Sequence, residues 1–146
     1  MCYARLMIRR AFHSLVLAGS AVLTVAALAA AQRPAAPRPA ALSSVTGGLW
    51  EISTSAAGTN ASRLCVRDPI ALAQYEHRSA ACTRVVIADK PSETVVHYTC
   101  PGGGFGQTKM TVLTPRSMRV ETQGIAHNAP FNYVLQVRRV GDCPAR

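Results

Sequence analysis

Alternating apolar and polar side chains, the pattern typical of half-buried β-strands, run through much of the chain after residue 46. In residues 47–54, the apolar side chains Trp50 and Ile52 alternate with polar ones. Residues 62–67 show a shorter version of this pattern, and residues 131–138 a longer one. Because such strands bury one face each, the pattern predicts a sheet with one face packed against a core.

One segment predicts a helix instead. Asp68 suits the N-cap position and Pro69 the first helical position. The helix should continue to about His77, with an apolar stripe formed by Ile70, Leu72, Ala73 and Tyr75. We expect a short helix that acts as a lid or plug on the sheet.

A hairpin is predicted on either side of the loop at residues 90–92. If Asp89 faces Glu93, the register brings Cys82 directly opposite Cys100. The residue pairs between these ends are then Val86 with Val96 and Arg84 with Tyr98. Opposed residues of antiparallel strands lie about 4.5 to 5.5 Å apart at Cα, within reach of a disulfide.

A second hairpin is predicted for residues 107–113 and 117–123. In one register Lys109 meets Glu121 on the outer face. The inner face then pairs Met110 with Val120 and Val112 with Met118. Residues 124–130 should form a loop before the last strand.

Four cysteines follow the first thirty residues, namely Cys65, Cys82, Cys100 and Cys143. An even number of cysteines in a small exported chain is typical of a disulfide framework. We favour Cys82–Cys100 together with Cys65–Cys143, and a link between Cys65 and Cys82 across the helix is the competing arrangement. The expected fold is mainly β: a curved antiparallel sheet of six to seven strands, a half-barrel or open meander, with one short helix and two disulfides.

The first 31 residues have the features of an export signal, with a basic start, an apolar run and an Ala-x-Ala site before Gln32. A retained membrane anchor is the alternative. Residues 32–46 are rich in Pro and Ala and predict a flexible linker, and residues 47–146 predict a single β-rich domain. The expected location is the bacterial periplasm, with secretion as the alternative.

The chain is basic, with 16 Lys and Arg against 7 Asp and Glu and a net charge of +9. Loss of residues 1–31 removes three arginines and no acid, which leaves +6. This charge favours loose attraction to anionic surfaces, but the basic residues are scattered. We therefore expect no specific nucleic-acid binding.

Several short features together suggest a family. They are Gly48-Leu49-Trp50-Glu51, the spaced cysteines, a Gly-rich turn before Lys109, and the closing run Gly141-Asp142-Cys143. In this order they resemble the exported bacterial family known as domain of unknown function 3617. The resemblance implies a small periplasmic β-rich domain with no assigned activity, and it supplies no catalytic residues.

The residues themselves show no catalytic motif in the part that should remain after cleavage. His77, His97 and His127 lack metal-ligand spacing, so we predict no metal site and no cofactor. One alternative is a small hydrolase whose site is assembled from His97, His127 and either Glu51 or Asp142.

The preferred functional prediction is a non-enzymatic binding or cell-envelope-associated module. Its partner is not identified by the sequence, with an apolar ligand or an envelope component as candidates. The concave face of the sheet would carry the binding site, with Trp50, Phe131 and Tyr133 as possible ligand contacts. The same aromatic side chains would also serve as a core.

Overall fold

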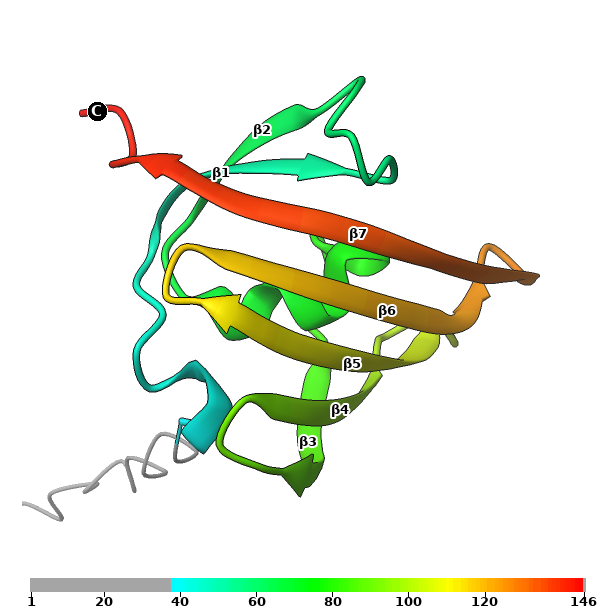
Figure 1. The fold of residues 1–146 in the computed structure, drawn as a ribbon. Helices are drawn as coiled ribbons and strands as arrows, with labels where there is room; N and C mark the ends of the chain where they lie inside the picture. The colour runs from blue at the N-terminus through cyan, green and yellow to red at the C-terminus, as the bar shows by residue number, and fades with distance from the viewer. Residues whose placement is uncertain (1–37, 146) are drawn as a thin grey trace, which may run out of the picture. The chain divides into compact units, whose positions relative to one another are not determined.

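A computed structural model describes residues 38–145, which form one seven-stranded antiparallel sheet (Figure 1). The strand order is β2-β1-β7-β6-β5-β4-β3. The strands are β1 (Gly48–Ser53), β2 (Ser62–Val66), β3 (Thr83–Asp89), β4 (Glu93–Thr99), β5 (Phe105–Thr114), β6 (Ser117–Ala126) and β7 (Ala129–Gly141). Two 3-10 helices complete this part of the chain, η1 (Ala40–Leu42) and η2 (Pro69–His77).

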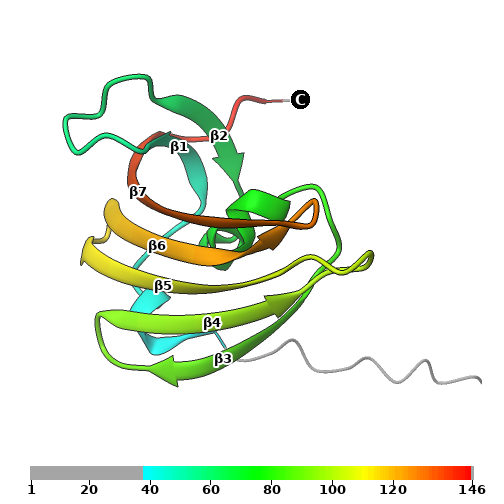
Figure 2. The same cartoon turned by 90° about the vertical axis from the view of Figure 1, so that its right-hand side faces the viewer.

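The sheet is curved but not closed, because β2 and β3 remain as its two edges and do not pair with each other. Figure 2 shows the strands following one another around the curve, with η2 lying against the concave side. Helix η2 packs against β5 and β6, and η1 packs against β4 and β5. The predicted fold class, a curved open antiparallel sheet with a short helix, is confirmed.

The core lies between the concave face of the sheet and these two helical segments. Its largest fully buried side chains include Trp50, Tyr98, Leu42, Leu72, Met110 and Met118. Burial of apolar area of this kind is the main favourable contribution to folding, at about 25 cal/mol per Å². The concave face is therefore filled by the protein's own side chains.

Helix η2 begins as the sequence predicts. The Asp68 side chain accepts a hydrogen bond from the backbone N–H of Ile70 at 3.4 Å, and Pro69 occupies the first turn. The backbone of Gln74 leaves helical geometry, with φ −109° and ψ 36°, so the helix is kinked there. Leu72 and Ala73 face the core on the buried side.

The segment before β1 differs from the prediction. Residues 38–46 were expected to belong to a flexible linker, but Ala41, Leu42 and Val45 are at most 2% exposed and belong to the core. Three apolar side chains in a short stretch can bury enough area to order it, in spite of the neighbouring prolines. The folded domain therefore starts near residue 38, and the predicted export signal and residues 32–37 lie outside the described residues.

Both predicted hairpins form. Lys109 pairs with Glu121, and the inner-facing pairs are Met110 with Val120 and Val112 with Met118, as predicted. In the first hairpin Val86 faces Val96 as predicted, but a bulge shifts the register beyond it. Asp89 consequently faces Thr94 rather than Glu93.

The expected loop at residues 124–130 is instead a tight hairpin. Strand β6 continues to Ala126 and β7 starts at Ala129, leaving a two-residue turn. His127 and Asn128 both have positive φ, 51° and 61°. This is the conformation of a type I′ turn, which joins twisted antiparallel strands directly.

Two disulfides link the sheet, and their partners are the favoured ones. Cys82 is bonded to Cys100 with a Cα–Cα distance of 4.1 Å, and Cys65 is bonded to Cys143 with a distance of 5.3 Å. The first joins the flanks of the β3–β4 hairpin. The second ties edge strand β2 to the residues that follow β7.

Candidate functional site

A groove of about 920 Å³ lies where the sheet fails to close. One wall comes from residues 67–70 after edge strand β2, and the opposite wall from residues 82–89 at edge strand β3. Residues 38–39 and 46–47 line it from the N-terminal segment. We call this the seam groove. Its volume is within the range of about 300 to 1,000 Å³ that is common for small-molecule sites.

Arg67 is held on its wall by close packing of the backbone. A Cβ atom on Gly47 would collide with the carbonyl oxygen of Arg67, so only glycine fits where the chain enters β1. The next residue, Asp68, is held by its bond to the N–H of Ile70. The backbone of this wall is therefore set by the start of β1 and the cap of η2.

Arg84 is held in position by a hydrogen bond to helix η2. It stands opposite Tyr98 in the β3–β4 register, and its Nη1 donates to Oε1 of Gln74 at 2.9 Å. Gln74 is only 5% exposed, and its Nε2 donates to the carbonyl of Ala80 at 2.8 Å. The kink in η2 lies at Gln74, whose buried side-chain amide binds Arg84.

Arg38 comes from the N-terminal segment. Its Nη2 donates to the backbone carbonyl of Val45, which folds the segment back on itself. The backbone N–H of Ala40 donates to Asp89 at the end of β3, at 2.7 Å. These two bonds fix this third side of the seam groove to the sheet edge.

The three arginines of the seam groove share an electrostatic property. The ion pairs among the described residues are formed by other basic groups: Arg63, Lys90, Lys109, Arg119, Arg138 and Arg139. Arg38, Arg67 and Arg84 have no carboxylate partner within the described part of the chain. The two carboxylates of the groove, Asp68 and Asp89, accept hydrogen bonds from backbone N–H groups instead.

The floor of the seam groove is largely apolar. It includes Ile70 from η2, Val85 and Val86 from β3, and Cys82 of the hairpin disulfide. Val86 is 37% exposed and points to the same face as Arg84, because it stands opposite Val96. Val85 stands opposite His97, so its side chain points to the other face of the strand. Exposed aliphatic side chains on an edge strand favour unwanted association. Arginines without an ion-pair partner beside exposed aliphatic side chains suit a ligand with a negative and an apolar part.

The predicted ligand contacts lie elsewhere. Trp50 is fully buried in the core, and its indole N–H has no hydrogen-bond partner among the described residues. Leu42 and Val45 belong to the same buried cluster, so Trp50 exposes no surface to a ligand in this structure. Its surroundings are those of a core residue.

Tyr133 and Phe131 are partly exposed, and each contacts a residue of helix η2. The Tyr133 hydroxyl donates to Oε2 of Glu76 at 2.8 Å, and Phe131 packs edge-on against His77. They line separate hollows of about 280 and 380 Å³. Burial raises the pKa of the Tyr133 hydroxyl, and the bond to Glu76 raises it further, so the group stays neutral at physiological pH.

Tyr98 lies deeper on the same face. Its hydroxyl is 3.2 Å from Nδ1 of His77, and burial raises its pKa to about 12. His77 therefore has a structural partner. Within residues 38–145 no three His, Cys, Asp or Glu side chains are arranged to hold a metal ion.

The four residues of the hydrolase alternative are not brought together. His97 lies on β4 beside Phe105, while His127 forms the exposed turn between β6 and β7. Glu51 is bound on both oxygens, by Arg63 and Arg138. Asp142 pairs with Arg139 after β7. No hydrogen bond of the described residues joins any two members of this set.

The seam groove has no simple sequence signal. Arg38, Arg67 and Arg84 come from three separate segments and look like isolated surface charges. The one local hint is the run Val85-Val86-Ile87, which shows no polar alternation. Such a run is ambiguous between a buried strand and an exposed binding edge.

Fold and groove together define a small disulfide-linked domain built on an open antiparallel sheet. The family described as Protein of unknown function (DUF3617) matches residues 37–143, so the chain belongs to this family. The match begins where the folded domain begins. Comparisons with curated proteins and with solved structures found no match.

Two further observations bear on the cellular compartment. The two disulfides are consistent with an exported protein, because reducing compartments keep thiols unpaired. Among the residues that the structure describes, no helix is long and apolar enough to cross a membrane.

Proposed function

We propose that this chain is an exported, non-enzymatic binding domain and that the seam groove is its ligand site. The predicted leader and the disulfide framework support export, with the bacterial periplasm as the compartment. Two disulfides and a filled core support a rigid scaffold. A ligand would then bind at the one region where both sheet edges and the N-terminal segment meet.

One observation carries this proposal: Arg38, Arg67 and Arg84 line the same partly apolar groove without a carboxylate partner among the described residues. Arg78 and Arg116 also lack an ion pair among the described residues, but they do not line this groove. Three unpaired guanidinium groups around exposed aliphatic side chains are arranged to receive a partner.

Native mass spectrometry of protein gently purified from the periplasm tests the proposal. We expect a copurified small molecule, and we expect the neutral fluorophore N-phenyl-1-naphthylamine to bind once that molecule has been removed. Val86→Trp, which fills the floor of the groove, should abolish binding of the fluorophore.

Leu113→Trp is the matched control, because Leu113 is 60% exposed and lies outside the seam groove. This variant should bind the fluorophore as the unchanged protein does. A bare protein that binds no fluorophore, or binding that survives Val86→Trp, would refute the proposed function.

A further inference from the structure

We infer that the ligand of the seam groove is a single-chain amphiphile with an anionic head, a carboxylate or a phosphate. The inference rests on the proposed function and adds the chemical class of the ligand. The head would contact the three arginines, and the acyl chain would cover the exposed aliphatic floor.

The three arginines keep N–H groups that are not hydrogen-bonded within the described residues and could bind such a head. A guanidinium carries five N–H donors in a planar fork that matches carboxylate and phosphate oxygens. Arg84 uses one nitrogen for Gln74, and Arg38 uses one for the Val45 carbonyl. Arg67 is exposed and makes no side-chain hydrogen bond among the described residues, so its N–H donors have no protein acceptor there.

The groove's own acids offset the charge of these cations only in part, and they form no ion pair with them. Asp89 is occupied by the N–H groups of Ala40 and Ala41, at 2.7 and 3.4 Å, and Asp68 caps η2. Three guanidinium groups outnumber two carboxylates in the lining. An anionic head is therefore favoured over a cationic one.

The floor accounts for the apolar part of the ligand. Val86 and Ile70 line the groove together with Cys82 of the hairpin disulfide, and none of these groups offers a strong hydrogen-bond partner. Covering exposed aliphatic side chains with an alkyl chain removes apolar area from water on both partners, which is favourable at about 25 cal/mol per Å².

An extended peptide added to the free edge of β3 fits less well. Adding a strand requires a continuous row of free backbone groups, and the bulge between Val86 and Ala88 interrupts that row. Beyond the bulge, Asp89 is joined to Ala40. Only the first four residues of the strand remain in regular register for a partner.

The test compares probes by isothermal titration calorimetry on the purified chain. Decanoate and decyl phosphate carry an anionic head, decyl maltoside carries a neutral head on a similar tail, and inorganic phosphate has no tail. We expect the two anionic amphiphiles to bind at least tenfold more tightly than the other two probes. Their affinity should fall as salt is raised to about 1 M, where the Debye length is about 3 Å.

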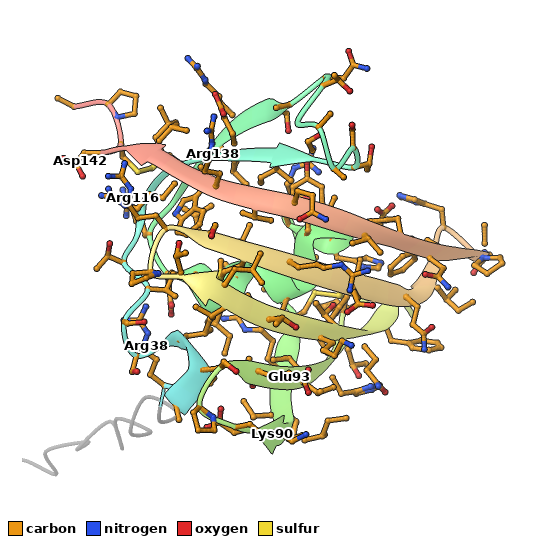
Figure 3. The ribbon with its side chains drawn as sticks, in the orientation of Figure 1. Arg38, Lys90, Glu93, Arg116, Arg138 and Asp142 are labelled. Carbon is orange, nitrogen blue, oxygen red and sulfur yellow. A yellow bond between two sulfur atoms is a disulfide. The ribbon has the colours of Figure 1, made fainter. Side chains whose placement is uncertain are left out.

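Arg67→Gln and Arg84→Gln should each weaken decanoate binding about tenfold, as expected for loss of one charge-assisted contact. Arg116→Gln is the matched control. Arg116 also lacks an ion pair among the described residues, and its Nη2 donates to the carbonyl of Arg139, outside the seam groove. Figure 3 shows it well apart from Arg38. Its substitution should leave decanoate binding unchanged.

The outcomes separate the two proposals. Equal binding of decyl maltoside and decanoate, or no effect of Arg67→Gln and Arg84→Gln, would overturn the inference while the groove could still bind neutral ligands. Inorganic phosphate binding as tightly as decyl phosphate would overturn the role of the tail. Displacement of decanoate by an acidic extended peptide, with protection of β3 amides from exchange, would identify a peptide ligand instead.

Discussion

The carboxylate of Asp89 accepts a hydrogen bond of 2.7 Å from the backbone N–H of Ala40, although 49 residues separate the two in the chain. The bond joins the end of edge strand β3 to the first turn of η1. It therefore closes one end of the seam groove and anchors the N-terminal segment to the domain. This relationship makes the segment part of the seam groove as well as part of the core.

Asp89→Ala should loosen this anchor. The loss of a carboxylate that accepts backbone N–H bonds costs about 1 kcal/mol in comparable helix caps. We expect that reduction in the free energy of unfolding by urea titration, together with faster proteolysis before residue 46. Asp142→Ala is the control, because this side chain is 91% exposed and its ion pair with Arg139 should contribute little. Equal stability and equal proteolysis of the two variants would contradict the anchor.

Leu42→Ala tests whether residues 38–46 belong to the folded domain. Leu42 is fully buried, and truncation of such a side chain destabilises a core by about 3 kcal/mol. The exposed neighbour Ser43 provides the control, and Ser43→Ala should change the free energy of unfolding by less than about 0.5 kcal/mol. If this segment is only a tether, both variants will unfold at the same urea concentration as the unchanged protein.

The sequence predicted the sheet well where two independent requirements agreed. In the β5–β6 hairpin, one register satisfies both the ion pair of Lys109 with Glu121 and the inner contact of Met110 with Val120. In the β3–β4 hairpin, the pair of Cys82 and Cys100 constrained the register only at the end far from the turn. The bulge after Val86 lies in an apolar run and left no signal in the alternation of side chains.

The N-terminal segment and the seam groove could not be predicted in the same way. Leu42 and Val45 stand in a segment of small, polar and proline residues, and they become core residues only because a curved sheet offers them a concave face. Arg67 and Arg84 approach one groove only because the sheet bends and leaves its two edges on either side of it. Both features depend on curvature, which local side-chain patterns do not encode.

Removal of each disulfide should lower the stability of the protein, and the two losses should differ in size. In the loop-closure account, the bond between Cys65 and Cys143 spans 78 residues and contributes about 4.5 kcal/mol, while the bond between Cys82 and Cys100 spans 18 and contributes about 3 kcal/mol. Paired Cys→Ala variants and urea unfolding measure the difference. Non-reducing peptide mapping should find these two links, and a peptide joining Cys65 to Cys82 would contradict the assignment.

The ion pairs of Glu51 on the outer face of the sheet should make the stability of the protein depend on pH in the acid range. Hydrogen bonds from Arg138 and Arg63 hold the pKa of Glu51 below its ordinary value of 4.5. Because the folded pKa is lower than the unfolded one, the stabilisation is present above the unfolded value and is lost as pH falls through the folded value. The difference in stability between the unchanged protein and Glu51→Gln should therefore shrink steadily below pH 4.5.

Urea unfolding at a series of pH values measures this difference. Glu121→Gln is a second case, since Lys109 holds the pKa of Glu121 below 4.5 in the same way. A stability difference that stays constant through the acid range would show that these ion pairs do not contribute to the pH dependence of folding.

The central claim is that ligand binds where the sheet fails to close. A titration of isotopically labelled protein with decanoate, followed by amide chemical shifts, tests it most directly. We predict shifts concentrated in residues 38–47, 67–70 and 82–89, the three segments that line the seam groove. Shifts centred on the outer face around Phe105 and His97, or no shifts with decanoate at any concentration below its micelle point, would contradict the account.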